Sequence, residues 1–367
     1  MRTLFAALVV AAPLAAQQKK VPELWLLDEV VQQAITKVGP AVVTIETFGG
    51  FRKQLGNTRP RPKPDEGDEG DDNKKKSLGP IVMPGFLQAQ GPGTGLIIGA
   101  EGWVVTSSFV LNYDPQTILV TLQDGRRFTA EVRGEDRSRG LAMLKVKAEE
   151  LPVAEILPAQ SIEVGQWVFA LARTFGAKRP TVHVGVVSAL RRISGRALQC
   201  DANTSPANYG GPLIDIEGRV MGIVSPLSPK GALAGADWYD SGIGFAVTLG
   251  DIPEILEGMK AGEVYRKGFL GVSMDQAHLG PGAKIMSITK RSPAQHANFR
   301  KGDMVIKVDG VAVKHSMHLQ DLIGGHVAGA WVTVVVKRKN GDEVEVLVQL
   351  DSPPPPKPPP PKPPPPR

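Results

Sequence analysis

The sequence contains few of the residue types on which disulfide, metal and nucleic-acid chemistry depends. Its single cysteine, Cys200, excludes an internal disulfide and any multi-cysteine metal site. A reactive thiol would need a neighbouring base, and a small buried residue is the interpretation that we favour. Aromatic residues make up 5% of the chain and no basic helix is evident, so the net charge of +6 does not indicate nucleic-acid binding. Half of that charge comes from Lys357, Lys362 and Arg367 near the C-terminus.

Long hydrophobic runs are also lacking. Residues 4–16 are mostly apolar, follow Arg2, precede a Gln-Gln-Lys-Lys sequence, and are fewer than the roughly 18 residues that a membrane helix needs. This pattern predicts a secretory signal peptide over residues 1–16, with cleavage after Ala16. We therefore expect a periplasmic or otherwise extracytoplasmic protein with no membrane span after signal removal. An uncleaved, anchored form is the alternative.

The rest of the sequence divides into segments of different character. Residues 26–37 carry apolar residues at helical spacing and end at a Gly-Pro pair, after which residues 41–45 are predicted to form a strand. Residues 50–91 are rich in proline, glycine and charge, which predicts a disordered loop. Short apolar runs bounded by turns then indicate the strands of an all-β barrel, at residues 95–98, 103–106, 118–122, 167–171, 184–188 and 220–224.

A second strand-rich unit follows this region, and a proline tail ends the chain. Residues 266–350 contain Asp-Gly and Asn-Gly dipeptides of the kind that hairpin turns require. Residues 352–367 are almost entirely proline with three basic residues, which predicts an extended polyproline II segment without a core. We therefore expect a barrel domain over residues 24–250, this second domain and a proline-rich tail.

The most informative segment spans residues 201–213 and ends in Asn-Tyr-Gly-Gly-Pro-Leu. Together with blocks at residues 93–106, 124–128 and 185–190, it resembles the HtrA (Deg) family of trypsin-like serine proteases over about residues 24–350. The resemblance implies a mainly β fold, in which a trypsin-like double β-barrel is followed by a PDZ domain. It also places the family's serine nucleophile where Tyr209 stands.

The resemblance implies that all three positions of the catalytic triad are substituted. The family's histidine follows a Thr-Asn-Asn-like run, and here the corresponding run precedes Phe109. Its aspartate precedes a short apolar segment, and that place holds Gly140. The family's oxyanion hole uses backbone N–H groups of the loop that contains Ala207, Asn208 and Tyr209. We therefore predict that the chain is not an enzyme.

The same conclusion follows from the residues alone. Serine-protease chemistry needs an imidazole within hydrogen-bond reach of the nucleophile. His183 is the only histidine before residue 266, and it lies in a predicted strand, where packing is a more common role than catalysis. Ser107, Ser108 and Ser205 flank the site without a candidate base. A tyrosine hydroxyl, with a reference pKa of about 10, is protonated at neutral pH.

Residues 266–350 resemble a PDZ domain, most specifically in the run 292–310 that begins with Ser-Pro-Ala. Such a domain adds an extended peptide as a strand and holds its terminal carboxylate with backbone N–H groups of a turn. The resemblance places that turn at Phe269, Leu270, Gly271 and Val272, and Leu319 and Leu322 of the following helix in the side-chain pocket. An ordinary strand entrance in a closed domain is the alternative.

We therefore predict a secreted, catalytically inactive HtrA-like protein that binds exposed peptides or C-termini and has a chaperone-like, scaffold or regulatory role in protein quality control. No metal or cofactor is predicted, since His315 and His318 have no neighbouring carboxylate or cysteine ligands. The resemblance implies a homotrimer, with residues 24–45 contributing, or assembly with an active paralogue. The alternatives are an active serine endopeptidase with a rearranged site, a surface-attachment role of the tail and charged loop, and a decaying gene product.

Overall fold

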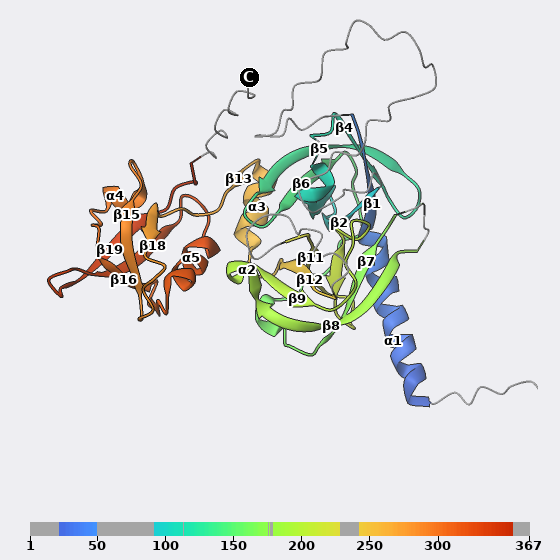
Figure 1. Ribbon diagram of the computed structural model, residues 1–367. Coiled ribbons are helices and arrows are strands. Elements are labelled where there is room, and N and C mark those ends of the chain that lie inside the picture. Colours follow the sequence, from blue (N-terminus) through green and yellow to red (C-terminus); the bar gives the residue numbers. More distant parts are fainter. Residues whose placement is uncertain are drawn as a thin grey trace, which may run out of the picture.

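The computed structural model describes residues 22–49, 92–112, 114–174, 176, 179–227 and 242–354, with side chains from residue 28 onward. The predicted signal peptide, the predicted disordered loop and the tail beyond residue 354 lie outside the described residues. The described chain forms two β-barrels followed by a third, smaller sheet (Figure 1), which confirms the predicted mainly β fold. Within these ranges, no helix has both the length and the apolar character that a membrane crossing requires.

Six antiparallel strands close the first barrel in the order β5-β4-β1-β2-β3-β6, because β6 pairs back to β5. The strands are β1 (Val42–Phe48), β2 (Gly93–Gly99), β3 (Trp103–Ser107), β4 (Thr117–Thr121), β5 (Arg127–Asp136) and β6 (Leu141–Val146). Helix α1 (Pro22–Val38) precedes β1 through the 3-10 turn η1 (Gly39–Ala41), and a second 3-10 turn, η2 (Ser108–Leu111), follows β3.

The second barrel is closed in the order β10-β11-β12-β9-β8-β7. Its strands are β7 (Trp167–Ala172), β8 (Thr181–Arg191), β9 (Ala197–Cys200), β10 (Pro212–Ile214), β11 (Val220–Val224) and β12 (Gly244–Thr248). The turn η3 (Ala159–Ser161) precedes β7, and the short helix α2 (Arg192–Gly195) joins β8 to β9. After β12, helix α3 (Pro253–Ala261) and strand β13 (Val264–Tyr265) return to the first barrel, where β13 pairs with β5.

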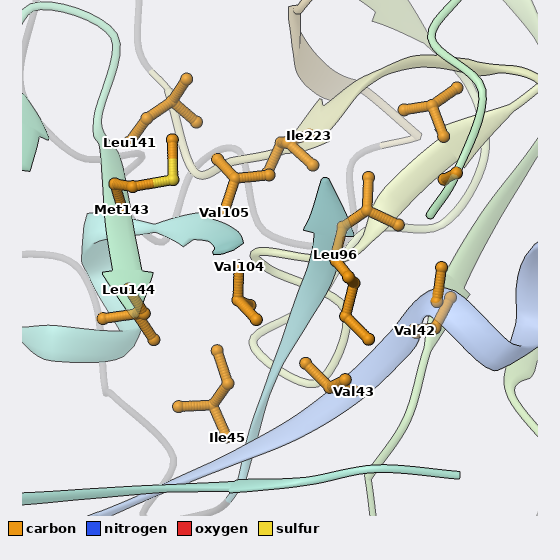
Figure 2. Close-up of a cluster of buried hydrophobic side chains, with 14 of the residues drawn as sticks. Val42, Val43, Ile45, Leu96, Val104, Val105, Leu141, Met143, Leu144 and Ile223 are labelled. Carbon is orange, nitrogen blue, oxygen red and sulfur yellow. The ribbon is translucent and has the colours of Figure 1, made fainter. Parts of the chain in front are cut away.

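One aliphatic cluster spans the two barrels, and the second barrel has a further hydrophobic cluster of its own. Figure 2 shows buried side chains of β1, β2, β3 and β6 gathered in one region, with Ile223 of the second barrel beside them. All of the labelled side chains are fully buried: Val42, Val43, Ile45, Leu96, Val104, Val105, Leu141, Met143, Leu144 and Ile223. Burying each of these side chains contributes about 1.5–3 kcal/mol, so the core fixes how the barrels face each other.

The third sheet forms a separate domain with its own core, in the order β14-β15-β16-β18-β19. Its elements are β14 (Val272–Met274), β15 (Ala283–Ile288), α4 (Pro293–His296), β16 (Met304–Val308), β17 (Val311–Ala312), α5 (Ser316–Gly325), β18 (Trp331–Lys337) and β19 (Glu343–Gln349). The turn between β16 and β17 contains Asp309 and Gly310, both with positive φ, as a tight hairpin turn requires. Strand β14 lies at one edge of the sheet.

A buried arginine fastens the second barrel to the start of the first. The Arg173 side chain, 3% exposed, donates from Nε to Val42 O at 2.7 Å and from Nη2 to Gly39 O at 2.9 Å. Its backbone N–H donates to Thr94 Oγ1, and its carbonyl accepts from Thr44 Oγ1 at 2.6 Å. Burial lowers the pKa of Arg173. These bonds satisfy carbonyls that the barrel closure removes from water.

Replacing this guanidinium is expected to destabilise the fold. Arg173→Met keeps much of the side-chain volume but removes the guanidinium bonds to Val42 O and Gly39 O, of which Gly39 O keeps the bond from Val42 N. Hydrogen bonds to charged groups contribute about 1.5–3 kcal/mol, and we expect a loss of this order in the free energy of unfolding. Urea denaturation monitored by circular dichroism measures this loss. The matched control is Arg126→Met, since Arg126 is half-exposed and its ion pair with Asp124 contributes less than about 1 kcal/mol. Equal losses in the two variants would contradict a fastening role for Arg173.

Candidate functional site

The loop from residue 201 to 211 leads from β9 to β10 and is held by hydrogen bonds to its own backbone. The fully buried Asn208 accepts at Oδ1 from Ser205 N at 2.7 Å and donates from Nδ2 to Asn203 O at 2.9 Å. The N–H groups of Asn208 and Tyr209 both donate to Ser205 O, at 3.0 and 3.1 Å. One of the expected oxyanion-hole donors, Tyr209 N–H, therefore points into the loop rather than toward a substrate.

Two glycines let this loop pass between the barrels. Gly210 has φ +86°, and a β-carbon there would lie 2.2 Å from both Thr106 Oγ1 and Thr94 O. A β-carbon on Gly211 would lie 2.1 Å from Leu171 O. No L-residue with a side chain fits at such separations without moving the backbone. The Gly-Gly pair is therefore a packing requirement of the barrel interface.

The side chains of Phe109 and Tyr209 meet at this interface. Their ring centroids lie 5.2 Å apart and their planes are inclined by 81°, an edge-to-face arrangement. Phe109 comes from η2 of the first barrel, yet it packs with Tyr209 in the hydrophobic cluster of the second barrel. The two residues are 3% and 4% exposed. The structure thus brings together two of the three residues that we placed at the triad positions, as an apolar contact.

The third of these residues, Gly140, contributes a backbone carbonyl to a group of hydroxyls. Gly140 O accepts from Ser108 N at 2.8 Å and lies 3.4 Å from both Ser107 Oγ and Ser225 Oγ. The two hydroxyl oxygens are 2.7 Å apart. Hydroxyls and a carbonyl lack the basicity to remove a proton from a nucleophile near neutral pH. This polar cluster ties β3 to the end of β11.

The two other side chains of the barrels considered as catalytic groups, His183 and Cys200, lie in strands of the second barrel. His183 is half-buried in β8 opposite Ala170, and β7 separates its strand from β10. Cys200 is fully buried in β9, and burial raises the pKa of its thiol to about 12, so it is protonated and unreactive near neutral pH. Across the described ranges, no group of three or more histidine, cysteine, aspartate or glutamate side chains is arranged to hold a metal ion.

A groove of about 340 Å³ lies between β14 and α5 in the third sheet. Five of the six residues predicted to bind peptide line it, and these are Phe269, Leu270, Gly271, Val272 and Leu319. The sixth, Leu322, is not among the lining residues and packs against the domain core instead. Ile323 lines the groove instead of Leu322. Ile323 lies four residues after Leu319 and Leu322 three residues after it, and in this helix the residue four positions on shares the groove-facing side with Leu319. Met274, Gln320 and Lys267 also line the groove.

The turn at the end of this groove is tightly built. Gly271 has φ +85°, and a β-carbon there would lie 2.2 Å from Ser292 Cβ. Gly271 O accepts from Thr289 N at 2.8 Å, and Leu270 O accepts from Ala294 N at 2.9 Å, so both carbonyls face away from the groove. The backbones of Phe269 and Asp351 exchange hydrogen bonds of 2.8 and 3.1 Å. The turn is thereby held from two sides.

Lys267 supplies a cation to the lining of the groove, and the sequence analysis did not single it out. Burial lowers the pKa of Lys267, and the nearby Arg196 cation lowers it further. His315 and His318 do not line the groove. They accept backbone hydrogen bonds at the start of α5, where His318 N donates to His315 Nδ1 and Lys314 N donates to His318 Nδ1. A turn with a neighbouring cation and an edge strand is suited to a peptide that ends in a carboxylate.

Comparisons with known proteins agree with this arrangement. The family described as "Trypsin-like peptidase domain" matches residues 93–223, and the family described as "PDZ domain" matches residues 268–350. A probable periplasmic serine endoprotease DegP-like of Hahella chejuensis is 30% identical over 294 residues, which are 75% of this chain and 60% of the relative. The putative serine protease HhoB of Synechocystis is 28% identical over 350 residues, 84% of this chain and 76% of the relative. The chain thus spans less than two thirds of the first relative.

Solved structures share the same fold. The serine endoprotease from Yersinia pestis superimposes with a TM-score of 0.59 at 25% identity, covering 88% of this chain and 97% of that structure. The HtrA-type protease AlgW with decapeptide gives a TM-score of 0.62 at 24% identity, covering 89% of this chain and 99% of that structure. The part of this chain that superimposes on each structure thus includes the double barrel and the third domain.

The aromatic contact between the barrels is expected to be stabilising and cooperative. Phe109→Ala and Tyr209→Ala each remove a buried ring, which costs about 3–5 kcal/mol of unfolding free energy. The double variant is expected to lose about 0.5–1.5 kcal/mol less than the sum, because the ring–ring term is removed only once. Urea denaturation of the four proteins gives this cycle. Phe48→Ala, at a half-exposed ring, is the control and should change stability by about 0.5 kcal/mol or less. Strict additivity would contradict the contact.

Proposed function

The chain belongs to the HtrA family, whose members join a trypsin-like peptidase domain to a PDZ domain, and from this we propose that it is a catalytically inactive member that binds peptides. The observation that carries the proposal is the buried edge-to-face contact of Phe109 and Tyr209. In our reading, this apolar pair occupies the place where the family has a histidine base and a serine nucleophile. The protein is then a binding protein with a chaperone-like, scaffold or regulatory role in protein quality control.

The chemistry of the site supports the loss of hydrolysis. A phenyl ring cannot accept a proton, and a tyrosine hydroxyl, with a reference pKa of about 10, is protonated and a poor nucleophile near neutral pH. The Tyr209 N–H donates to Ser205 O, so it does not stabilise an oxyanion in this arrangement. The carbonyl of Gly140 offers no carboxylate to orient an imidazole. Each of the three roles of a triad lacks its side chain.

The groove of the PDZ domain supports peptide binding. Its edge strand β14 has room for an added strand, and apolar residues of α5 line the adjacent pocket. The related AlgW structure was solved with a decapeptide. We propose that exposed segments or C-termini of other proteins bind here, with their carboxylate near Gly271 and Lys267. Relatives named as periplasmic support an extracytoplasmic location, and we extend the proposal to assembly as a homotrimer or with an active paralogue.

The purified mature chain is expected to leave fluorescein-labelled casein intact over hours at pH 6–9. Tyr209→Phe removes the hydroxyl while keeping the ring, and Ser205→Ala and Ser107→Ala remove the flanking hydroxyls, so each variant is expected to give the same background. Fluorescence dequenching measures turnover. Hydrolysis by the parent chain that disappears in any one of these variants would show an active, rearranged site and overturn the proposal.

Peptide binding is expected to depend on the Lys267 cation in the groove lining. Lys267→Gln should weaken binding of fluorescein-labelled decapeptides with apolar C-terminal residues about tenfold, since a charge-assisted hydrogen bond contributes roughly 1.5 kcal/mol or more. The same decapeptides with amidated C-termini should bind the parent and the variant alike. Fluorescence polarisation measures both. Lys284→Gln, outside the groove, is the matched control. Equal losses for acid and amide peptides would contradict carboxylate recognition.

A further inference from the structure

A second concavity of the PDZ domain has no place in the proposed peptide binding. It has a volume of about 820 Å³ and shares no lining residue with the peptide groove. Its walls come from β13 and the residue after it, from α4, and from the ends of β18 and β19 where the hairpin meets residues 350–352. We call it the tail groove, because the C-terminal segment leaves the fold from its wall.

The tail groove exposes large apolar side chains. Trp331 is 60% exposed, Leu347 is 61% exposed and Val264 is 47% exposed, and all three line it. The register pairs Trp331 with Gln349 and Thr333 with Leu347, so Trp331 and Leu347 are diagonal neighbours on the outward face of the hairpin. The domain core lies on the opposite face, where Val332 and Val348 are buried. Core packing therefore does not account for the indole and its neighbours.

An exposed indole beside an aliphatic side chain is suited to bind proline rings. Polyproline II segments dock into aromatic-lined grooves, and they lose little conformational entropy because the helix is already formed when free. The charged lining residues include Arg266 as well as Asp351, so the groove does not favour the basic residues of such a segment by charge. Recognition at this groove would rest on the proline rings themselves.

The chain carries such a segment at the edge of the same groove. Leu350 is buried, Asp351 and the half-buried Ser352 line the groove, and Pro353 follows directly. Residues 355–367 are proline except for Lys357, Lys362 and Arg367. At about 3.1 Å per residue, eight residues in the polyproline II form extend about 25 Å, which is the length of a seven-residue strand such as β19. The tail begins where the groove lies and is long enough to cover it.

We propose that residues 355–362 of the tail dock in the tail groove of the same molecule, with proline rings against Trp331 and Leu347. Attachment at Ser352 gives the segment an effective concentration of the order of millimolar, so a weak site suffices for high occupancy. The interaction covers the apolar side chains that the β18–β19 hairpin exposes. It is independent of peptide binding in the other groove and of any catalytic activity.

The test uses fluorine NMR of the mature chain labelled with 5-fluorotryptophan, with the Trp331 resonance assigned through Trp331→Phe. Replacing the prolines at 355, 356 and 358–361 by serine is expected to move the Trp331 resonance and to leave the other tryptophan resonances in place. Truncation after Pro354, which keeps every described residue, should give the same shift. The control replaces Lys357 and Lys362 by serine and should leave the Trp331 resonance unchanged.

Two outcomes would overturn the proposal. An unchanged Trp331 resonance in both the serine variant and the truncated chain would show that the tail does not reach the indole. A Trp331 resonance that moves toward its truncated position on dilution of the parent chain would show that the tail of a neighbouring copy occupies the groove. A shift that is independent of protein concentration supports docking within one molecule.

Discussion

The arrangement of the site depends on how closely the two barrels approach each other at Gly210 and Gly211. The backbone of the loop passes within contact distance of Thr94, Thr106 and Leu171, and only residues without a β-carbon allow this. The same approach brings η2 of the first barrel against the loop of the second, so that Phe109 and Tyr209 meet. A trypsin-like fold lets two barrels present side chains to one point. In the inactive member that we propose, the two barrels still meet there, and the side chains at that point are apolar.

The proposed protein keeps the protease fold without the side chains that hydrolysis needs. The interface that would position a base and a nucleophile is filled by two buried rings and by the hydroxyls of Ser107 and Ser225. Catalytic groups commonly lower the stability of a fold, because activity needs strained or destabilised active sites. A buried pair of rings at the same interface stabilises it instead. The proposed loss of hydrolysis is therefore compatible with a well-packed molecule. The function that we propose depends on the PDZ domain, whose core and groove are separate from this interface.

The sequence predicted the double barrel and the third domain through its ordered motifs, and each of the seven strands predicted between residues 41 and 224 is present. It did not indicate β5, because a bulge between Val132 and Gly134 breaks the alternation of apolar and polar residues along that strand. The sequence analysis placed neither Ile323 nor Lys267 in the groove. The register of α5 against β14 decides the position of Ile323, and the path of the chain between β13 and β14 decides that of Lys267; both are set by tertiary packing. The direction of the Tyr209 N–H also follows from the loop conformation, which composition does not determine.

The paired backbones of Phe269 and Asp351 have a mechanical consequence. Asp351 is where the last strand gives way to the tail, and Phe269 opens the turn that holds the end of the peptide groove. Tension applied to the C-terminus, for example by a partner that grips the prolines, loads these two hydrogen bonds before it reaches the seven-residue pairing of β18 with β19. Because only two bonds bear the initial load, the turn yields first. Force applied to the C-terminal tail would therefore distort the turn at the end of the groove, where we propose that the C-termini of other proteins bind.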